Sequence, residues 1–159
     1  MYNHAPENYH CPFCQLASGV DLDQKHSMQT DIVYKDEDII VFIARDGWPG
    51  NEGHALIAPA KHYENIYDLP DSLIPKIYGM EKRIAIAMKK AYNTGGISSR
   101  QHNEPIGGQD VWHYHLAVLP RYENDELYLN IYKRNFIDPK VREDFANRLK
   151  IELNKLIIL

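Results

Sequence analysis

Alternating histidines in one short segment, Trp112-His-Tyr-His-Leu-Ala-Val118, constrain the fold more than any other feature of the sequence. Side chains along a β-strand point alternately to its two faces, so a strand over 111–119 places His113, His115 and Ala117 on one face. The other face then carries an apolar set typical of a core, namely Trp112, Tyr114, Leu116 and Val118. The histidine face must therefore meet something polar, such as a ligand, a metal or water. Two neighbouring imidazoles are not both charged at neutral pH, so one at least can act as a nucleophile, a base or a metal ligand.

The rest of the chain predicts an α+β domain whose sheet is mainly antiparallel and five-stranded. Short β-branched and aromatic runs predict four further strands, over 31–34, 39–42, 55–58 and 97–99. Apolar residues at helical spacing predict a long helix from Ser72 to about Tyr92, stopped by Gly95-Gly96. The same spacing predicts a C-terminal helix with an apolar stripe of Val141, Phe145, Leu149, Leu153 and Leu156.

Length, charge and cysteine content narrow the class of protein. The 159 residues suit a single domain, and 18 basic against 22 acidic residues give a net charge of −4. A mildly acidic chain has no general attraction for nucleic acid, and no stretch approaches the ~18 apolar residues of a membrane span. Residues 1–10 lack the layout of a secretory signal, and two cysteines do not make a disulfide scaffold. We therefore expect a cytoplasmic protein with neither a nucleic acid nor a membrane as its partner.

Three segments together resemble the histidine triad (HIT) family. Gly107 to Tyr122 is similar to the family signature, in which histidines alternate with apolar residues after a Gly-Gln loop. Gly53 to His62 is similar to a second family segment, and Cys11-Pro-Phe-Cys14 to the cysteine pair of the zinc-bearing, bacterial-type branch. The resemblance covers a HIT-like domain over 11–122, preceded by an irregular tail (1–10) and followed by a helical extension (123–159).

This resemblance implies a nucleotide-binding fold, usually a homodimer, that binds a purine nucleotide or nucleotide conjugate. The implied reaction is hydrolysis or transfer at the α-phosphate of a nucleoside phosphoramidate or dinucleotide polyphosphate. The middle histidine of the triad, His115 by position, would attack phosphorus and form a nucleotidyl-histidine. The implied nucleotide-binding residues are His54, His102, Asn103, Gly108, Gln109 and Asp110, with backbone N–H groups around 108–110 on the phosphoryl oxygens.

The chain departs from the family pattern at several positions. Ala117 stands at the third histidine, which leaves three interpretations: a slow enzyme, a transferase-like branch, or a nucleotide- or partner-binding module without turnover. A deliberate substitution would look the same in the sequence. Asp110 replaces the usual Ser or Thr, and a one-residue gap leaves either Asn103, which we prefer, or His102 as the phosphate-loop contact. Asp46 is a poor match for the expected ribose-binding group.

The resemblance also implies a structural zinc ion. A closed zinc site needs four ligands, and a Cys-x-x-Cys pair supplies only two of them. By position, the implied set is Cys11, Cys14, His62 and His113, which leaves His115 free for chemistry. His54 is the competing ligand, or a residue that supports the ligands.

Overall fold

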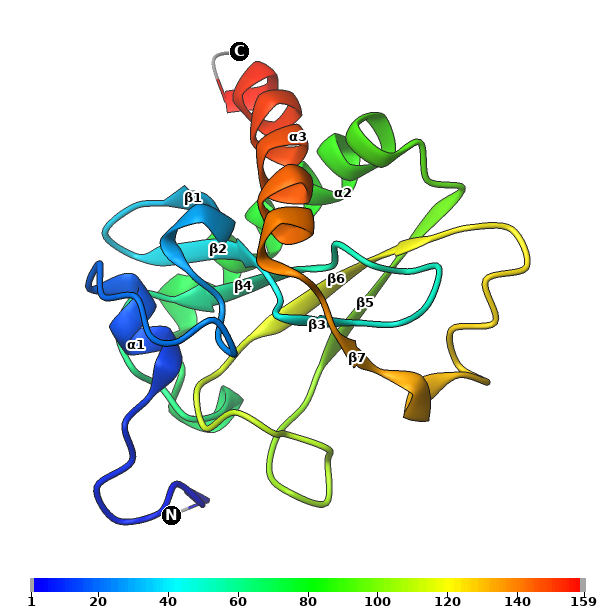
Figure 1. Ribbon diagram of the computed structural model, residues 1–159. Helices are drawn as coiled ribbons and strands as arrows, with labels where there is room; N and C mark the ends of the chain where they lie inside the picture. The colour runs from blue at the N-terminus through cyan, green and yellow to red at the C-terminus, as the bar shows by residue number, and fades with distance from the viewer. Residues whose placement is uncertain (1, 158–159) are drawn as a thin grey trace.

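The computed structural model describes residues 2–157 and has one five-stranded antiparallel sheet with helices on both faces (Figure 1). The sheet order is β1-β2-β4-β6-β5, and each neighbouring pair is antiparallel. Its strands are β1 (Ile32–Lys35), β2 (Ile39–Ile43), β4 (Ala55–Pro59), β5 (Gly96–Gln101) and β6 (Leu116–Arg121). The helices are α1 (Pro12–Ala17), α2 (Ile74–Tyr92) and α3 (Pro139–Ile157), and a two-stranded sheet pairs β3 (Asp46–Gly47) with β7 (Asn135–Phe136). The predicted α+β architecture, with its long helix and C-terminal helix, is confirmed.

Four short 3-10 turns complete the element list. They are Gln29–Asp31, Ile66–Asp68, Asp71–Leu73 and Ile131–Lys133. The first residue of the predicted tail and the last two residues of the predicted extension lie outside the described residues.

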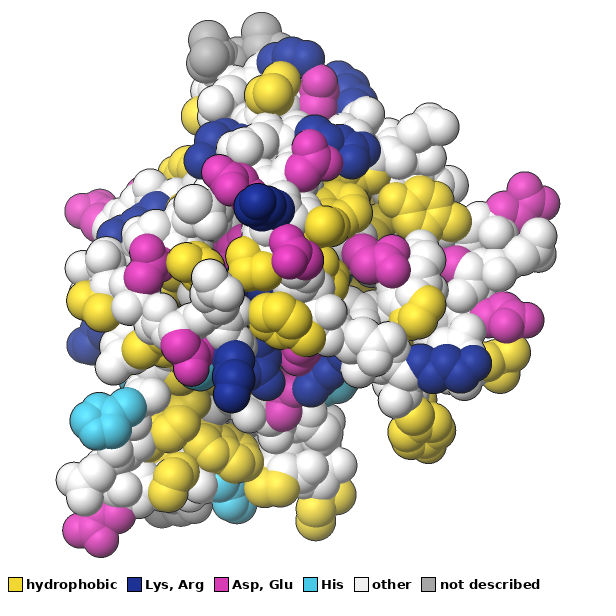
Figure 2. All heavy atoms as spheres, viewed as in Figure 1, with side chains coloured by type: hydrophobic (Ala, Val, Ile, Leu, Met, Phe, Trp, Pro, Cys, Tyr) yellow, Lys and Arg dark blue, Asp and Glu magenta, His cyan; other side chains and the backbone are white. Residues whose placement is uncertain are grey.

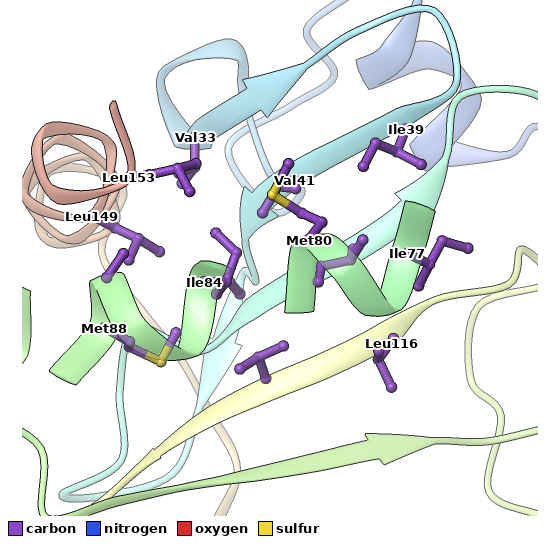
Figure 3. Close-up of a cluster of buried hydrophobic side chains, with 14 of the residues drawn as sticks. Val33, Ile39, Val41, Ile77, Met80, Ile84, Met88, Leu116, Leu149 and Leu153 are labelled. Atoms are coloured by element: carbon purple, nitrogen blue, oxygen red, sulfur yellow. The ribbon is translucent and has the colours of Figure 1, made fainter. Parts of the chain in front are cut away.

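Both faces of the central strands are buried, because helices cover the sheet on each side. Along β2, Val41 and Ile43 face the cluster formed with α2 and α3, and Phe42 faces the cluster formed with α1. Figure 3 shows Ile77 and Ile84 of α2 against the strands, with Leu149 of α3 at one side of the cluster. A near-continuous apolar run is the expected sequence pattern for such a doubly covered strand.

The ends of α2 differ from the prediction. Residues 71–73 form a 3-10 turn, so the helix begins at Ile74 and Ser72 makes no cap hydrogen bond. The helix ends because Asn93 adopts a left-handed conformation with φ of 55°. The Gly95-Gly96 pair is therefore not the stop, and Gly96 instead begins β5.

The histidine segment also differs, because β6 begins at Leu116 rather than near Val111. Residues 111–115 approach the sheet as irregular backbone, anchored where the N–H of Tyr114 donates to the carbonyl of Tyr63 at 2.6 Å. The predicted alternation still holds for the core, since Tyr114, Leu116 and Val118 all lie in the cluster under α2. Trp112 is the exception, being only half-buried and packed on the ring of His4. Strand β6 also continues through Pro120, where the sequence predicts its end. The proline is tolerated because β4 pairs with β6 only as far as Val118, so no partner on that side needs a backbone N–H from Pro120.

The predicted apolar stripe of α3 is confirmed only in part. Leu149 and Leu153 are fully buried in the main core, as expected, but Val141 is 46% exposed. Its neighbour Arg142 is fully buried in its place.

No helix within residues 2–157 has the length and apolar character needed to cross a bilayer. On the face shown in Figure 2, basic and acidic side chains are interleaved, and neither sign forms a continuous field.

Candidate active site and metal centre

Cysteine and histidine side chains from three segments of the chain converge beside α1. Cys11 and Cys14 flank the first turn of α1, His62 follows β4, and His113 precedes β6. Their potential ligand atoms all lie within 4.8 Å of one another. The structure thus brings together the predicted set, and it places His54 elsewhere.

The distances fit a tetrahedral zinc ion. Bonds of about 2.3 Å to sulfur and about 2.1 Å to nitrogen would hold such atoms about 3.5 Å apart. Here Cys11 Sγ lies 3.2 Å from His113 Nδ1, and Cys14 Sγ lies 3.3 Å from His62 Nδ1. The second ring nitrogen of His113 is 2.9 Å from the carbonyl of Pro59, which fixes the N–H on Nε2 and leaves the Nδ1 lone pair toward the sulfurs. Two cysteines and two histidines form a closed structural zinc site, with no position left for a substrate.

A cavity of about 500 Å³ opens on the same face of the sheet, beside the metal centre. His115 and Ala117 lie in its wall, and Phe13 connects the two sites because its ring contacts the rings of both His113 and His115. Other wall residues come from α1, the segment before β1, the β2–β4 connection, β5 with the loop after it, and the chain before β7. They include Leu16, Ser27, Asp46, Trp48, His54, Arg100, His102, Gly108, Asp110 and Arg134.

His115 is held in one orientation and one protonation state. Its Nδ1 donates a hydrogen bond to the carbonyl oxygen of His113 at 2.8 Å, so the lone pair is on Nε2. Burial lowers the pKa of the His115 imidazole, although its hydrogen bond to the His113 carbonyl and the charge of Asp110 oppose the shift. A neutral imidazole with a free Nε2 is therefore present in the cavity wall at neutral pH.

The glycine loop before this histidine is tightly folded. Gly107 has no Cβ because the carbonyl of Asn103 occupies that space, and Gly108 has a φ of +88°. The N–H of Gly108 donates to Pro105 and that of Gln109 to Glu104, so these two donors are already used within the loop. We expected backbone groups of 108–110 to face a phosphate, and the structure leaves at most the N–H of Asp110 for this role.

Only part of the predicted nucleotide set lines the cavity. His54, His102, Gly108 and Asp110 do so, whereas Asn103 and Gln109 do not. The side-chain oxygen of Asn103 accepts a hydrogen bond from the N–H of Ile66, and Gln109 is buried with its amide on the carbonyl of Glu64. Between the two alternatives for the loop contact, the cavity wall contains His102 rather than the preferred Asn103.

Asp110, unexpected beside a phosphate, is paired with a cation. Arg134, from the chain before β7, lies 2.8 Å from Asp110 and 3.7 Å from Asp46. The guanidinium of Arg134 contributes to holding the pKa of Asp110 below its usual value, although burial opposes the shift. Asp46 itself lies in the cavity wall, although the sequence makes it a poor match for the ribose-binding group.

His54 is buried at the end of the cavity against Trp48, and its Nδ1 has no hydrogen-bond partner within residues 2–157. Burial lowers the pKa of His54 to about 3, and the charges of Arg100 and Arg134 add to the shift. The unfolded chain, with a histidine pKa near 6.5, binds one more proton than the folded chain between these pH values. The contribution of His54 to stability is therefore complete above about pH 6.5 and decreases as the pH falls.

We predict that His54→Gln flattens this dependence. Between pH 4 and pH 6, the slope of the unfolding free energy against pH should fall by about 1.4 kcal/mol per pH unit relative to the parent chain. Urea denaturation of both proteins over this range measures the difference, and any loss of zinc at low pH affects both alike. Parallel curves would show that His54 is protonated in the folded state.

The fold and the two sites define a class of protein. It is an α+β domain with a metal centre that joins α1 to the sheet, and with a neutral histidine in the wall of the neighbouring cavity. A family model named HIT domain matches residues 25–124, so the chain belongs to the HIT family. It is 30% identical over 144 residues to Protein hit of Bacillus subtilis, covering 91% of each chain. It is also 27% identical over 118 residues to adenylylsulfatase HINT3 of Arabidopsis thaliana, covering 74% of this chain and 55% of that protein.

A solved structure agrees with this assignment. The Zn-bound histidine triad family protein from Mycobacterium smegmatis superposes with a TM-score of 0.74 at 25% identity, covering 94% of this chain and 96% of that one. The resemblance to the zinc-bearing, bacterial-type branch is confirmed, with Ala117 at the third triad position.

Three arginines line the cavity, Arg45, Arg100 and Arg134, and the sequence marked none of them as a site residue. Arg100 precedes the glycine loop on β5, and Arg134 lies in the segment that we treated as an extension. Neither belongs to a family segment, so no motif marked them. The one available signal was the alternation of β5, which puts Arg100 on the same face of the sheet as Ala117, its register partner.

Proposed function

We propose that this protein is a nucleotide-binding hydrolase or transferase that acts at the α-phosphate through a nucleotidyl-histidine formed on His115. The observation that carries the proposal is the fixed imidazole in the cavity wall, with Nδ1 occupied by the His113 carbonyl and Nε2 unprotonated. Membership of the HIT family supports it, as does the relative named adenylylsulfatase. The homodimer that the resemblance implies stays a prediction.

The chemistry divides into two displacements. Nε2 of His115 attacks the α-phosphorus, a P–N bond forms, and the bond to the leaving group breaks with its electron pair. Water or another acceptor then attacks the same phosphorus, the P–N bond breaks with its electron pair returning to Nε2, and the proton of the attacking group is released to solvent. Imidazole suits both steps because it is a good nucleophile and a good leaving group, so one difficult displacement becomes two easier ones.

The cavity offers suitable surroundings for each part of a nucleotide. Apolar side chains of α1 and β4, such as Phe13, Leu16 and Leu56, can cover a base. The carboxylate of Asp46 can accept hydrogen bonds from sugar hydroxyls. We assign the phosphate contacts to His102 and to the backbone N–H of Asp110.

Zinc has a structural role in this proposal. Bound by Cys11, Cys14, His62 and His113, it joins α1 to the sheet and fixes the backbone whose carbonyl orients His115. Phe13, which covers one side of the His115 ring, lies between the two cysteine ligands.

A second candidate is a nucleotide-binding module without turnover. Ala117 favours it, because a methyl group at the third triad position supplies neither a proton nor a hydrogen bond. The loss of one such donor commonly costs on the order of 100-fold in rate.

Two measurements test the proposal. Crystals soaked with AMP should place its phosphorus about 3–3.5 Å from Nε2 of His115, within reach for attack. Purified protein should also cleave a dinucleoside polyphosphate, with the Ala117→His variant assayed beside it. If AMP binds but neither protein cleaves any nucleotide, the binding module is correct; if AMP does not bind at all, both candidates fall.

A further inference from the structure

Arg100 occupies the space beside the missing histidine. It is the register partner of Ala117 across the β5–β6 pair, and opposite residues of such a pair have Cβ atoms about 5 Å apart. Both residues lie in the wall of the cavity that contains His115. A charge is therefore available next to the position where the family pattern has an imidazole.

The guanidinium of Arg100 has no anionic partner of its own. Within residues 2–157 no carboxylate lies in ion-pair distance of it, and its buried Nε makes no hydrogen bond. Its carbon Cζ lies 4.7 Å from the centre of the Trp48 ring, a cation–π contact that satisfies none of its N–H donors. A half-buried cation whose N–H donors make no hydrogen bonds destabilises the protein unless an anion binds to it.

The cavity as a whole favours an anion. Its wall contains Arg45, Arg100 and Arg134 against Asp46 and Asp110, which is three positive charges against two negative on a chain of net charge −4. Arg45 and Arg134 are engaged with those carboxylates, and Arg100 is not. The unbalanced charge is thus the one beside Ala117.

We propose that Arg100 binds the leaving-group anion, and that it makes the site selective for nucleotides whose leaving group departs as a stable anion. A nucleoside phosphate or sulfate can leave as such an anion, taking the electron pair of the broken P–O bond without a proton. An amine leaving a phosphoramidate must take up a proton. Arginine gives charge and N–H donors, but it stays protonated and cannot supply that proton. This inference rests on the proposed function and names its substrate class.

Binding tests the inference without relying on turnover. The parent chain should bind ADP, whose β-phosphate reaches the leaving-group side, at least about 10-fold more tightly than AMP. Arg100→Gln should abolish this preference and change the AMP affinity less than about threefold, while Arg100→Lys should retain part of it. Arg83→Gln, the same change at an exposed position of α2, is the matched control and should leave both affinities unaltered. Calorimetry gives the affinities, and thermal melting checks that each variant is folded.

Cleavage gives the second readout. The parent chain should cleave diadenosine triphosphate or adenylyl sulfate at least about 100-fold faster than adenosine 5′-phosphoramidate, measured as kcat/KM. Ala117→His should narrow this ratio, and Arg100→Gln should lower kcat/KM only for the substrates with anionic leaving groups.

The outcomes separate this inference from the proposed function. Equal binding of ADP and AMP, or an equal loss of both in Arg100→Gln, overturns the role of Arg100 and leaves the proposed function intact. An ADP preference that depends on Arg100 in a protein without turnover supports the anion site and overturns the enzyme. No binding of either nucleotide overturns both.

Discussion

His115→Asn should abolish nucleotide cleavage, lowering kcat by on the order of 10⁴-fold or more, as expected when a covalent nucleophile is removed. Asparagine keeps a polar side chain of moderate size in the cavity wall but has no lone pair able to attack phosphorus. The affinity for AMP should therefore change less than about threefold. Mass spectrometry of protein quenched during turnover should detect an AMP adduct on the parent chain and none on the variant.

The control is His10→Asn, the same substitution at an exposed histidine outside the cavity. It should retain the activity and the adduct of the parent chain. If His115→Asn retains more than about a tenth of the activity, His115 is not the nucleophile and direct attack by water becomes the better mechanism.

The sequence predicted the metal centre and the core better than it predicted the cavity. The four zinc ligands could be named because each lies in a segment with a recognisable pattern, although His113 is 102 residues from Cys11. The core strands could be located because apolar, β-branched runs such as 39–43 have few alternatives to a buried strand.

Tertiary contacts determine where helices and strands end and which charged residues lie in the cavity wall, so neither could be predicted from local sequence patterns. Strand β6 starts late because His113 binds the carbonyl of Pro59 at the end of β4 and Tyr114 binds the carbonyl of Tyr63 after it. Local propensity contains neither contact. Arg134 reaches Asp110 only because the chain returns past the cavity to form β7. Such contacts cannot be read from the period of a strand or a helix.

The burial of Arg142 likewise could not be predicted from the apolar pattern of its helix. The spacing of Arg142, Ala146, Leu149 and Leu153 is helical, and all four residues are fully buried. A search for apolar residues passes over the arginine and selects Val141, its exposed neighbour. The information was present in the periodicity, but the chemistry of the side chain argued against burial until its partner was known.

That partner is Asp31, whose Oδ2 lies 3.0 Å from Nε of Arg142 at a site where neither side chain is exposed. The same guanidinium donates to the carbonyls of Ile137 at 2.7 Å and His26 at 3.0 Å, so it joins the start of α3 to the segment before β1. Burial raises the pKa of Asp31, while the N–H of Met28 and the charge of Arg142 oppose the shift. The pair is thus a buried junction rather than a surface ion pair.

Arg142→Met should destabilise the protein by about 3–5 kcal/mol, because it leaves a buried carboxylate and two buried carbonyls without their donor. Adding Asp31→Asn should recover a large part of the loss, since the remaining amide is neutral and its oxygen can still accept the hydrogen bond from Met28. Lys140→Met, an exposed basic residue in the first turn of the same helix, is the matched control and should change stability by less than about 0.5 kcal/mol. Urea denaturation measures all three. A loss below about 1 kcal/mol for Arg142→Met would mean that water reaches Asp31 once the guanidinium is gone, and that the apolar contacts of α3, such as those of Leu149 and Leu153, are enough to hold the helix.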